Sequence, residues 1–361
     1  MRRRELALTV AATLGCGTGA IACQPSLVVS PGDTLFSIAE EQLGDLSRWS
    51  LIFYNNPDIQ GGSLLDLPAG TVLDIPCPED TAQTAEPAAT PAPAPTAAPT
   101  VQADPKPLQQ EKAQAEIKLV TASNYAPFTD LDWPGQGMLT ELVNAAFEAT
   151  PNPLTYAIEW ENDWSRHLFP MLDSKEFDMG FPWFKPDCDG NPTNERCANF
   201  HFSDPLVDLV ILLFARSDDP IVFAQDSDLH GKTLCRPAGY FTHDLDRADR
   251  RWLSDGLVTL KQPPTPDDCF AMLVAGDVDA VALNEFLGVQ KMFELGLTDQ
   301  VAPLSRPVSI EGLHVLISKT HWRGTAHLYR FNAGLAKLKQ SDRYNEIVSR
   351  HLALFWDQIK S

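Results

Sequence analysis

The sequence predicts an α/β protein that is preceded by a small α+β module and a linker. From residue 117 onward, strand-like runs alternate with helical patterns, which is typical of layered α/β domains. Residues 78–115 are dominated by Ala, Pro, Thr and Gln, so they lack the apolar side chains that a core needs. Before them, Cys23 and Cys77 bracket a short segment with its own turn and helix signals.

Length and charge narrow the functional classes. The chain has 361 residues and a formal net charge of −20, and this length allows about two or three domains with ample core. The acidic balance argues against nucleic-acid binding, because phosphate recognition needs a basic patch. A small anionic ligand remains compatible, since it needs only a local positive site.

Residues 1–22 are predicted to be a secretory signal peptide. Residues 2–4 are all arginine, residues 6–21 form an apolar run, and Ala20-Ile21-Ala22 is a small-x-small cleavage site. Export by the general route and by the twin-arginine route both remain open. No later stretch reaches the roughly 18 apolar residues of a membrane-spanning helix. We therefore expect a soluble protein in the periplasm.

The cysteines predict disulfide bonds. The chain has seven cysteines, and Cys16 lies in the signal peptide. An even number remains, which in an exported protein indicates disulfides, with about 15 possible pairings. Proximity in sequence favours the pairs Cys23–Cys77, Cys188–Cys197 and Cys235–Cys269. The alternative of lipidation at Cys23 is less favoured, because it would leave Cys77 without a partner.

Residues 23–77 are predicted to fold as strand, helix, helix, strand. Residues 26–29 and 72–75 read as strands, and residues 46–54 keep a helical pattern. Asp33 or Thr34 can cap the helix that carries Leu35, Ile38, Ala39 and Leu43. Such a small core is marginal by itself, so a Cys23–Cys77 bond would stabilise it.

This module resembles the LysM family. The resemblance rests on Pro31–Leu35, Ile38-Ala39, Asn56-Pro57, Ala69–Thr71, Leu73 and Ile75-Pro76. It implies binding of N-acetylglucosamine-containing glycans, here peptidoglycan, in a shallow groove between two loops. The glycan-binding residues it implies are Gly32, Asp33, Thr34, Leu35, Asn56, Pro57, Asp58 and Ile59. The alternative is that Asp33, Thr34 and Asn56 only cap helices and form turns, and the two roles are compatible.

Residues 78–115 are predicted to be a disordered linker. Pro-rich chains extend by about 3.1 Å per residue, so a linker of this length could span up to roughly 100 Å. Such a length suits a tether between a wall-bound module and a second domain.

The α/β part begins at residue 116. We expect strands at residues 117–121, 156–160, 177–180, 206–215, 233–236, 257–259, 280–283 and 313–318. We expect helices at residues 138–149, 163–172, 243–253, 266–275, 325–340 and 344–355. The long apolar strand at 206–215 could pass between two lobes, and the strand at 313–318 could return.

Residues 185–205 form the most informative loop. Cys188 and Cys197 are close enough in sequence to clasp it, and Arg196 lies inside the clasp. A guanidinium on a cross-linked loop is suited to a carboxylate, because its planar fork matches the two oxygens. The alternative is a surface turn whose arginine is only solvated.

Residues 116–361 resemble the type 2 periplasmic solute-binding proteins, most nearly those that bind polar amino acids for ABC transporters. The resemblance rests on Tyr125–Phe128, Phe177–Met179, Thr193–Arg196, Phe202–Pro205, Asp228–Lys232, Gly239 and Gly276–Val281. It implies a monomer with lobe 1 at residues 116–212 and 312–361, and lobe 2 at residues 213–311. It also implies a ligand enclosed at the hinge and a partner ABC permease.

The resemblance assigns roles to single residues. Arg196 matches the arginine that holds a ligand carboxylate, and Tyr240 stands where a small hydroxyl residue usually assists it. Asn284 stands where an aspartate usually holds the ligand ammonium. A buried ammonium needs a negative charge, and Asn284 has none. The ligand-binding residues that we expect are Tyr125, Phe128, Trp164, Trp183, Phe184, Arg196, Tyr240, Asn284 and Glu285.

We therefore predict a small anionic, carboxylate-bearing ligand that is partly apolar. Trp133 would add to the apolar surface of the cleft, whereas Trp183 and Phe184 could instead belong to a lobe core. Arg236 is a second candidate cation, with a surface strand end as its alternative state. The stretch Asp187–Asn191 is close to a calcium loop, but Gly190 is misplaced for that pattern, so we expect no metal.

The predicted function is that of an exported, peptidoglycan-associated solute-binding protein for uptake or sensing. Common hydrolase, metalloprotease and phosphate-binding motifs are missing from the sequence, so we predict neither an enzyme nor a cofactor. One alternative is a degenerate binding fold with a structural or regulatory role in the cell envelope. Another is a dehydratase-like enzyme that uses Glu285 or Asp132 as its acid.

Overall fold

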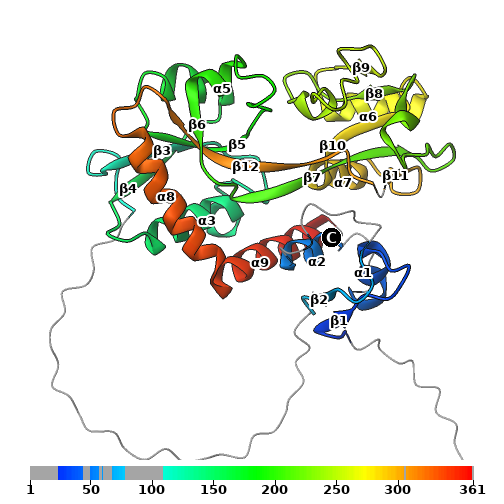
Figure 1. The fold of residues 1–361 in the computed structure, drawn as a ribbon, viewed down its shortest axis with the longest axis horizontal. Helices are drawn as coiled ribbons and strands as arrows, with labels where there is room; N and C mark the ends of the chain where they lie inside the picture. The colour runs from blue at the N-terminus through cyan, green and yellow to red at the C-terminus, as the bar shows by residue number, and fades with distance from the viewer. Residues whose placement is uncertain are drawn as a thin grey trace, which may run out of the picture.

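The structure is a computed structural model that describes residues 23–43, 49–56, 59, 67–77, 109–304 and 306–359. The predicted signal peptide and residues 78–108 of the predicted linker lie outside the described residues. The described chain contains a two-stranded sheet near its start and a ten-stranded sheet after residue 116 (Figure 1). None of its helices is long and apolar enough to cross a membrane.

The N-terminal module has the predicted order of elements. Its described residues form β1 (Ser26–Val28), α1 (Leu35–Leu43), α2 (Trp49–Asn55) and β2 (Val72–Asp74), and the two strands pair antiparallel. The apolar side chains of Ile38, Ile52 and Leu73 are buried between them. A Cys23–Cys77 disulfide joins the two ends, with its Cα atoms 5.7 Å apart.

This module packs against the last helix of the chain, α9 (Asp342–Ile359) (Figure 1). The Trp356 indole Nε1 donates a hydrogen bond to Ser50 Oγ of α2 at 3.2 Å. Both side chains are almost fully buried, Trp356 at 1% exposure. A core as small as that of the module gains stability from burying apolar surface against a larger neighbour.

The described residues resume at Gln109, within the predicted linker. Gln109 forms a β-bridge with Tyr156, and the Gln110 backbone N–H donates to the Tyr156 carbonyl at 2.7 Å. The predicted linker at residues 78–115 is therefore too long at its C-terminal end. Backbone pairing with a strand needs no apolar side chains, so composition does not reveal it.

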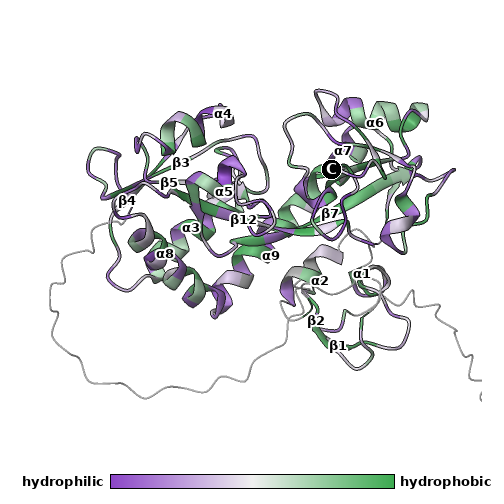
Figure 2. Cartoon of the chain, turned by 45° about the horizontal axis from the view of Figure 1, so that its top comes forward, coloured by the Kyte–Doolittle hydropathy of each residue, from purple (hydrophilic) through white to green (hydrophobic). Residues whose placement is uncertain are grey.

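The large sheet has the strand order β4-β3-β5-β12-β7-β10-β8-β9, with β6 beside β12 and β11 beside β7. Its strands are β3 (Ile117–Thr121), β4 (Tyr156–Trp160), β5 (Met179–Phe184), β6 (Phe200–Phe202), β7 (Val207–Arg216), β8 (Thr233–Cys235), β9 (Thr259–Lys261), β10 (Ala280–Asn284), β11 (Val301–Pro303) and β12 (Ser309–Ser318). The parallel pairs β3–β4 and β8–β9 lie at opposite ends. The long antiparallel pair β7–β12 connects the two lobes, and Figure 2 shows β7 as a mostly hydrophobic strand.

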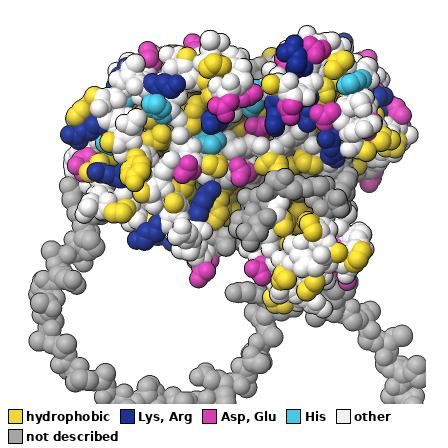
Figure 3. Space-filling model, viewed as in Figure 1, with side chains coloured by type: hydrophobic (Ala, Val, Ile, Leu, Met, Phe, Trp, Pro, Cys, Tyr) yellow, Lys and Arg dark blue, Asp and Glu magenta, His cyan; other side chains and the backbone are white. Residues whose placement is uncertain are grey.

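Helices cover both lobes (Figure 1). The longer ones are α3 (Met138–Ala149), α6 (Pro266–Ala275), α7 (Glu285–Glu294), α8 (Gly324–Lys339) and α9. The short ones are η3 (Pro134–Gln136), α4 (Trp164–Arg166), η4 (His167–Leu172), α5 (Glu195–Asn199), η5 (Asp226–Leu229) and η6 (His243–Leu245). Acidic and basic side chains are interspersed over the visible face of both lobes (Figure 3).

The prediction of a helix at residues 243–253 is wrong. Only η6 forms, and the chain then runs through turns. The Asp246 carboxylate accepts hydrogen bonds from the backbone N–H groups of Leu253, at 3.1 Å, and Ser254, at 2.8 Å. An aspartate that bonds backbone groups further along the chain competes with helix formation.

The helix α7 is absent from the sequence prediction. Asn284 ends β10 and caps α7, because its side-chain oxygen accepts from the Leu287 N–H at 3.0 Å. Gly288 lets α7 lie close to β7, since a Cβ atom there would be 2.0 Å from the Phe214 ring. Strand β10 and helix α7 thus follow each other without a loop, so no loop in the sequence marks the boundary between them.

Candidate ligand site between the lobes

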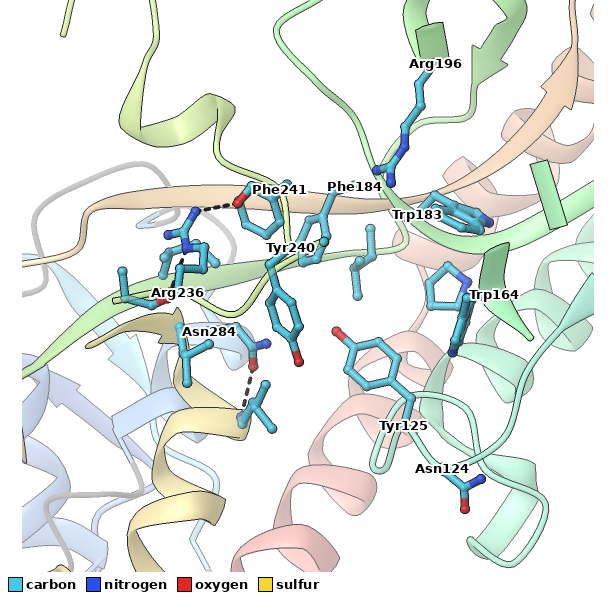
Figure 4. A pocket seen from close by; sticks show the side chains of 17 residues that line it. Asn124, Tyr125, Trp164, Trp183, Phe184, Arg196, Arg236, Tyr240, Phe241 and Asn284 are labelled. Atoms are coloured by element: carbon cyan, nitrogen blue, oxygen red, sulfur yellow. Dashed lines mark hydrogen bonds between the residues drawn. The ribbon is translucent and has the colours of Figure 1, made fainter. Parts of the chain in front are cut away.

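A cavity of about 320 Å³ lies between the lobes. Lobe 1 contributes Tyr125, Trp164 and Arg196 to its lining, and lobe 2 contributes Tyr240 and Asn284 (Figure 4). Trp183 and Phe184, at the end of β5, also line it. Its size falls in the range of small-molecule sites.

Arg196 is held by local structure on both sides. The Cys188–Cys197 disulfide forms as expected, with its Cα atoms 5.4 Å apart. Asn194 caps α5 by accepting a hydrogen bond from the Arg196 N–H at 3.0 Å. These restraints fix the backbone from which the guanidinium extends into the cavity (Figure 4).

The Arg196 guanidinium lacks an anionic partner within the described residues. It lies 4.9 Å from the centre of the Trp183 ring, a cation–π arrangement. Burial lowers the pKa of Arg196 from its ordinary value, although an arginine stays charged in proteins. A partly buried charge of this kind is stabilised by an incoming anion, which a carboxylate can satisfy with two parallel hydrogen bonds.

Aromatic rings form much of the wall around this charge. The Tyr125 and Trp164 rings meet edge to face at 6.4 Å, and Trp164 meets Trp183 in the same way at 5.5 Å. Tyr240 comes from the other lobe, and its hydroxyl and that of Tyr125 both point into the cavity (Figure 4). Burial raises the pKa of both tyrosines, so each hydroxyl remains a neutral hydrogen-bond donor.

Arg236 lines the same cavity but is buried and paired, so the expectation of a surface strand end is wrong. Its side chain is 1% exposed and forms two bonds to the Asp244 carboxylate, at 2.5 and 2.9 Å. It also donates to the backbone carbonyls of Ala282 and Phe241. The carboxylate neutralises the charge, and the four hydrogen bonds occupy most of its N–H donors.

The cavity lining contains neither aspartate nor glutamate. Asn284 is 7% exposed, and its oxygen is occupied by the cap of α7. Glu285, an expected ligand residue, is the first residue of α7, is 1% exposed and does not line the cavity. An ammonium group in this cavity would therefore meet π faces and neutral oxygens rather than a carboxylate.

Two other aromatic expectations are corrected. Phe128 is fully buried outside the cavity and packs between Tyr125, at 4.9 Å, and Phe286, at 5.3 Å. Trp133 donates its indole N–H to His351 Nδ1 at 2.9 Å, away from the cavity. Phe241 is a lining residue that the sequence analysis missed, although its position directly after Tyr240 was a usable signal.

The expected glycan-binding residues have structural contacts. Asp33 accepts from the Ser30 N–H at 2.8 Å, and Thr34 accepts from the Ser37 N–H at 3.0 Å as a helix cap. The Asn56 amide bonds the backbone of β2 in both directions. Gly32 has a positive φ of 93°, and Leu35 is fully buried. Ile59 is partly buried, whereas Pro57 and Asp58 lie outside the described residues.

No arrangement of three or more His, Cys, Asp and Glu side chains suited to a metal ion is present in the described part of the chain. The third disulfide, Cys235–Cys269, forms as expected beside Arg236. It ties the end of β8 to α6 within lobe 2.

Several solved structures are similar to this chain. A histidine kinase sensor domain with similarity to periplasmic binding proteins is 24% identical over 65% of this chain and 94% of its own, with a TM-score of 0.49. A mutant arginine-binding protein from T. maritima is 20% identical over 67% and 97%, with a TM-score of 0.48. The substrate-binding protein of an amino acid ABC transporter is 22% identical over 65% and 97%, with a TM-score of 0.46.

No curated protein matches the chain in sequence. Residues 117–353 match the family of bacterial extracellular solute-binding proteins, family 3, and this segment covers most of the chain. The two lobes joined by β7 and β12 agree with that match. The chain therefore belongs to the bacterial extracellular solute-binding proteins, family 3.

Proposed function

We propose that this chain is an exported binding protein that closes on a small carboxylate-bearing solute between its lobes. The observation that carries the proposal is the Arg196 guanidinium, which is partly buried in the cavity without an ion-pair partner among the described residues. A solute carboxylate would supply that partner. The membership of a solute-binding family favours binding over catalysis.

The site lies between the lobes, so a ligand that contacts both would hold them closed. Arg196 belongs to lobe 1 and Tyr240 to lobe 2, and β7 and β12 connect the lobes. A carboxylate on Arg196 that also accepts from the Tyr240 hydroxyl would hold the lobes together. Closure would remove water and strengthen both contacts, because charges interact more strongly at low dielectric.

The N-terminal module would hold the solute-binding domain at the cell wall. Its strand–helix–helix–strand order and its resemblance to LysM support binding to peptidoglycan glycans. We assign residues 23–77 to this module and residues 116–361 to the solute-binding domain. The bound solute would pass to an ABC permease or inform a sensor in the periplasm.

A thermal-shift screen of the mature chain tests the proposal, with organic acids, amino acids and peptidoglycan fragments as probes. A probe at 100 times its Kd should stabilise the protein by about 2.7 kcal/mol, or roughly 5–10 °C. The shift should disappear in Arg196→Ala. It should persist in the control Arg323→Ala, whose arginine lies over the exposed Trp322.

Two results would contradict the proposal. One is a shift of equal size in Arg196→Ala, which would place the anion elsewhere. The other is no shift from any probe while peptidoglycan still retains the protein, which would favour a structural role in the cell envelope.

A further inference from the structure

A second cavity of about 500 Å³ adjoins the first and has exposed residues in its lining, among them Gly190 and Asn191. It lies between the disulfide-closed loop of lobe 1 and the chain that follows β8 in lobe 2. Arg196, Gly239, Tyr240 and Phe241 line both cavities. Arg196 therefore stands at the junction of an inner and an outer cavity, so an anion bound to it need not lie at the end of a ligand.

The two cavities differ in chemistry. The inner cavity is walled by aromatic and aliphatic side chains and has no carboxylate in its lining. The outer cavity is lined mainly by polar groups, among them Asn191, Thr242 and His243, and by the carboxylates Asp187 and Asp246. A ligand that spans both would place an apolar part inside and a polar, cationic part outside.

The charged groups of the outer cavity are not equally available. His243 lies 3.0 Å from Glu311, and Arg251 pairs with Asp255 at 2.9 Å. Burial alone would raise the pKa of Asp246, but hydrogen bonds from Ser254 and Leu253 lower it and occupy both of its oxygens.

The Asp187 carboxylate, by contrast, is available to a ligand. Its Oδ1 accepts one bond from the Gly190 N–H at 2.9 Å, and none of the described cations forms an ion pair with it. Asp187 directly precedes Cys188 and Arg196 directly precedes Cys197, so the disulfide ties the two residues together and the protein presents an available anion and an available cation along one ligand path.

This arrangement suits a peptide better than a free α-amino acid. An α-amino acid carries its ammonium on the carbon next to the carboxylate, where the inner cavity has no negative charge. In a peptide the nitrogen beside the C-terminal carboxylate is a neutral amide, which needs only a hydrogen-bond acceptor. The free amine lies several bonds further away, where Asp187 lines the outer cavity. The loss of a negative charge at Asn284 then has a physical reason.

We propose that the solute is a short peptide with a free C-terminus and an apolar last side chain. Its carboxylate lies on Arg196, its last side chain fills the aromatic inner cavity, and its amino terminus lies near Asp187. The inference rests on the proposed function, since it needs Arg196 as the anion site.

Isothermal titration calorimetry on the mature chain tests it with four probes: L-phenylalanine, alanyl-phenylalanine, its N-acetyl derivative and its C-terminal amide. We expect the dipeptide to bind at least tenfold more tightly than phenylalanine. The C-terminal amide should not bind, and the N-acetyl derivative should bind about fivefold more weakly than the dipeptide.

Two variants test how much the charge of Asp187 contributes to the affinity. Asp187→Asn keeps the acceptor for the Gly190 N–H, and it should weaken the dipeptide about fivefold but leave the N-acetyl derivative unchanged. The matched control is Asp189→Asn, an exposed carboxylate of the same loop that does not line the cavity. It should change neither affinity.

The outcomes distinguish this inference from the proposed function. If phenylalanine binds as tightly as the dipeptide, depends on Arg196, and is insensitive to Asp187→Asn, the peptide inference is overturned and the carboxylate site stands. If binding of every probe is unaffected by Arg196→Met, both are overturned.

Discussion

Two arginines line one cavity from opposite lobes, and each is next in sequence to a disulfide-bonded cysteine. Arg196 precedes Cys197 and Arg236 follows Cys235. Arg236 is 1% exposed and bound to the Asp244 carboxylate. Arg196 is partly exposed, rests on the Trp183 ring and has no ion-pair partner in the described part of the chain.

The difference teaches that a cation in a cavity is not by itself a ligand site. Arg236 and Asp244 satisfy each other, and their pairing positions the Tyr240–Phe241 loop through the Phe241 carbonyl. Arg196 is satisfied only in part, by an aromatic face. The first arrangement stabilises the fold, whereas the second leaves interaction energy for a ligand.

The largest expected effect is on stability, from Arg236→Ala. Removing one partner leaves the buried Asp244 uncompensated, which should lower the free energy of unfolding by about 3–5 kcal/mol. Urea denaturation measures this change. The exposed pair of Arg251 and Asp255 is the control, and Arg251→Ala should leave the free energy of unfolding nearly unchanged. A loss of similar size in both variants would contradict the contrast between paired and unpaired arginines.

The next largest loss of stability is expected from removing the disulfide beside each arginine. Replacing Cys188 and Cys197 by serine, which opens a link over a sequence separation of 9, should cost about 2.5 kcal/mol in chain entropy. The same change at Cys235 and Cys269, with a separation of 34, should cost about 4 kcal/mol. Denaturation of the two double variants, each under oxidising conditions, compares them. The reverse order of losses would show that strain rather than loop length dominates.

A change of ligand preference should follow from Asn284→Asp. The new carboxylate can still cap α7 through the Leu287 N–H, and it adds the negative charge that the inner cavity lacks. We expect L-phenylalanine to bind about tenfold more tightly, or about 1.4 kcal/mol, as measured by calorimetry. Asn191→Asp places a charge in the outer cavity as the control and should have less effect. No gain in Asn284→Asp would mean that the ammonium of an amino acid does not lie near residue 284.

The smallest effect on stability is expected from Arg196→Met. The side chain keeps its apolar stem and loses a charge without an ion-pair partner, so the unfolding free energy of the ligand-free protein should change by less than about 1 kcal/mol. Urea denaturation beside Arg236→Ala makes the comparison direct. A loss above about 2 kcal/mol would assign Arg196 a structural role and remove the contrast.

Much of the fold was predictable because its signals are local. The helices at residues 138–149 and 266–275 keep an apolar face, and the structure confirms both. The disulfides follow from the spacing of the cysteines, and all three pairs form as expected. The helix expected at residues 243–253 failed because one side chain, Asp246, bonds the backbone seven and eight residues further on.

The sequence by itself determined most of the order of elements, the clasped loop and the presence of an arginine within it, because turns, periodicity and cysteine spacing act between near neighbours. Only the tertiary structure decided that Arg236 is neutralised by Asp244 and donates a hydrogen bond to a carbonyl 46 residues away. It also decided that Glu285 begins a helix and leaves the cavity, and that Arg196 remains without an ion-pair partner among the described residues. Charge compensation depends on which groups the fold brings within a few ångströms of each other, and no local pattern contains that distance.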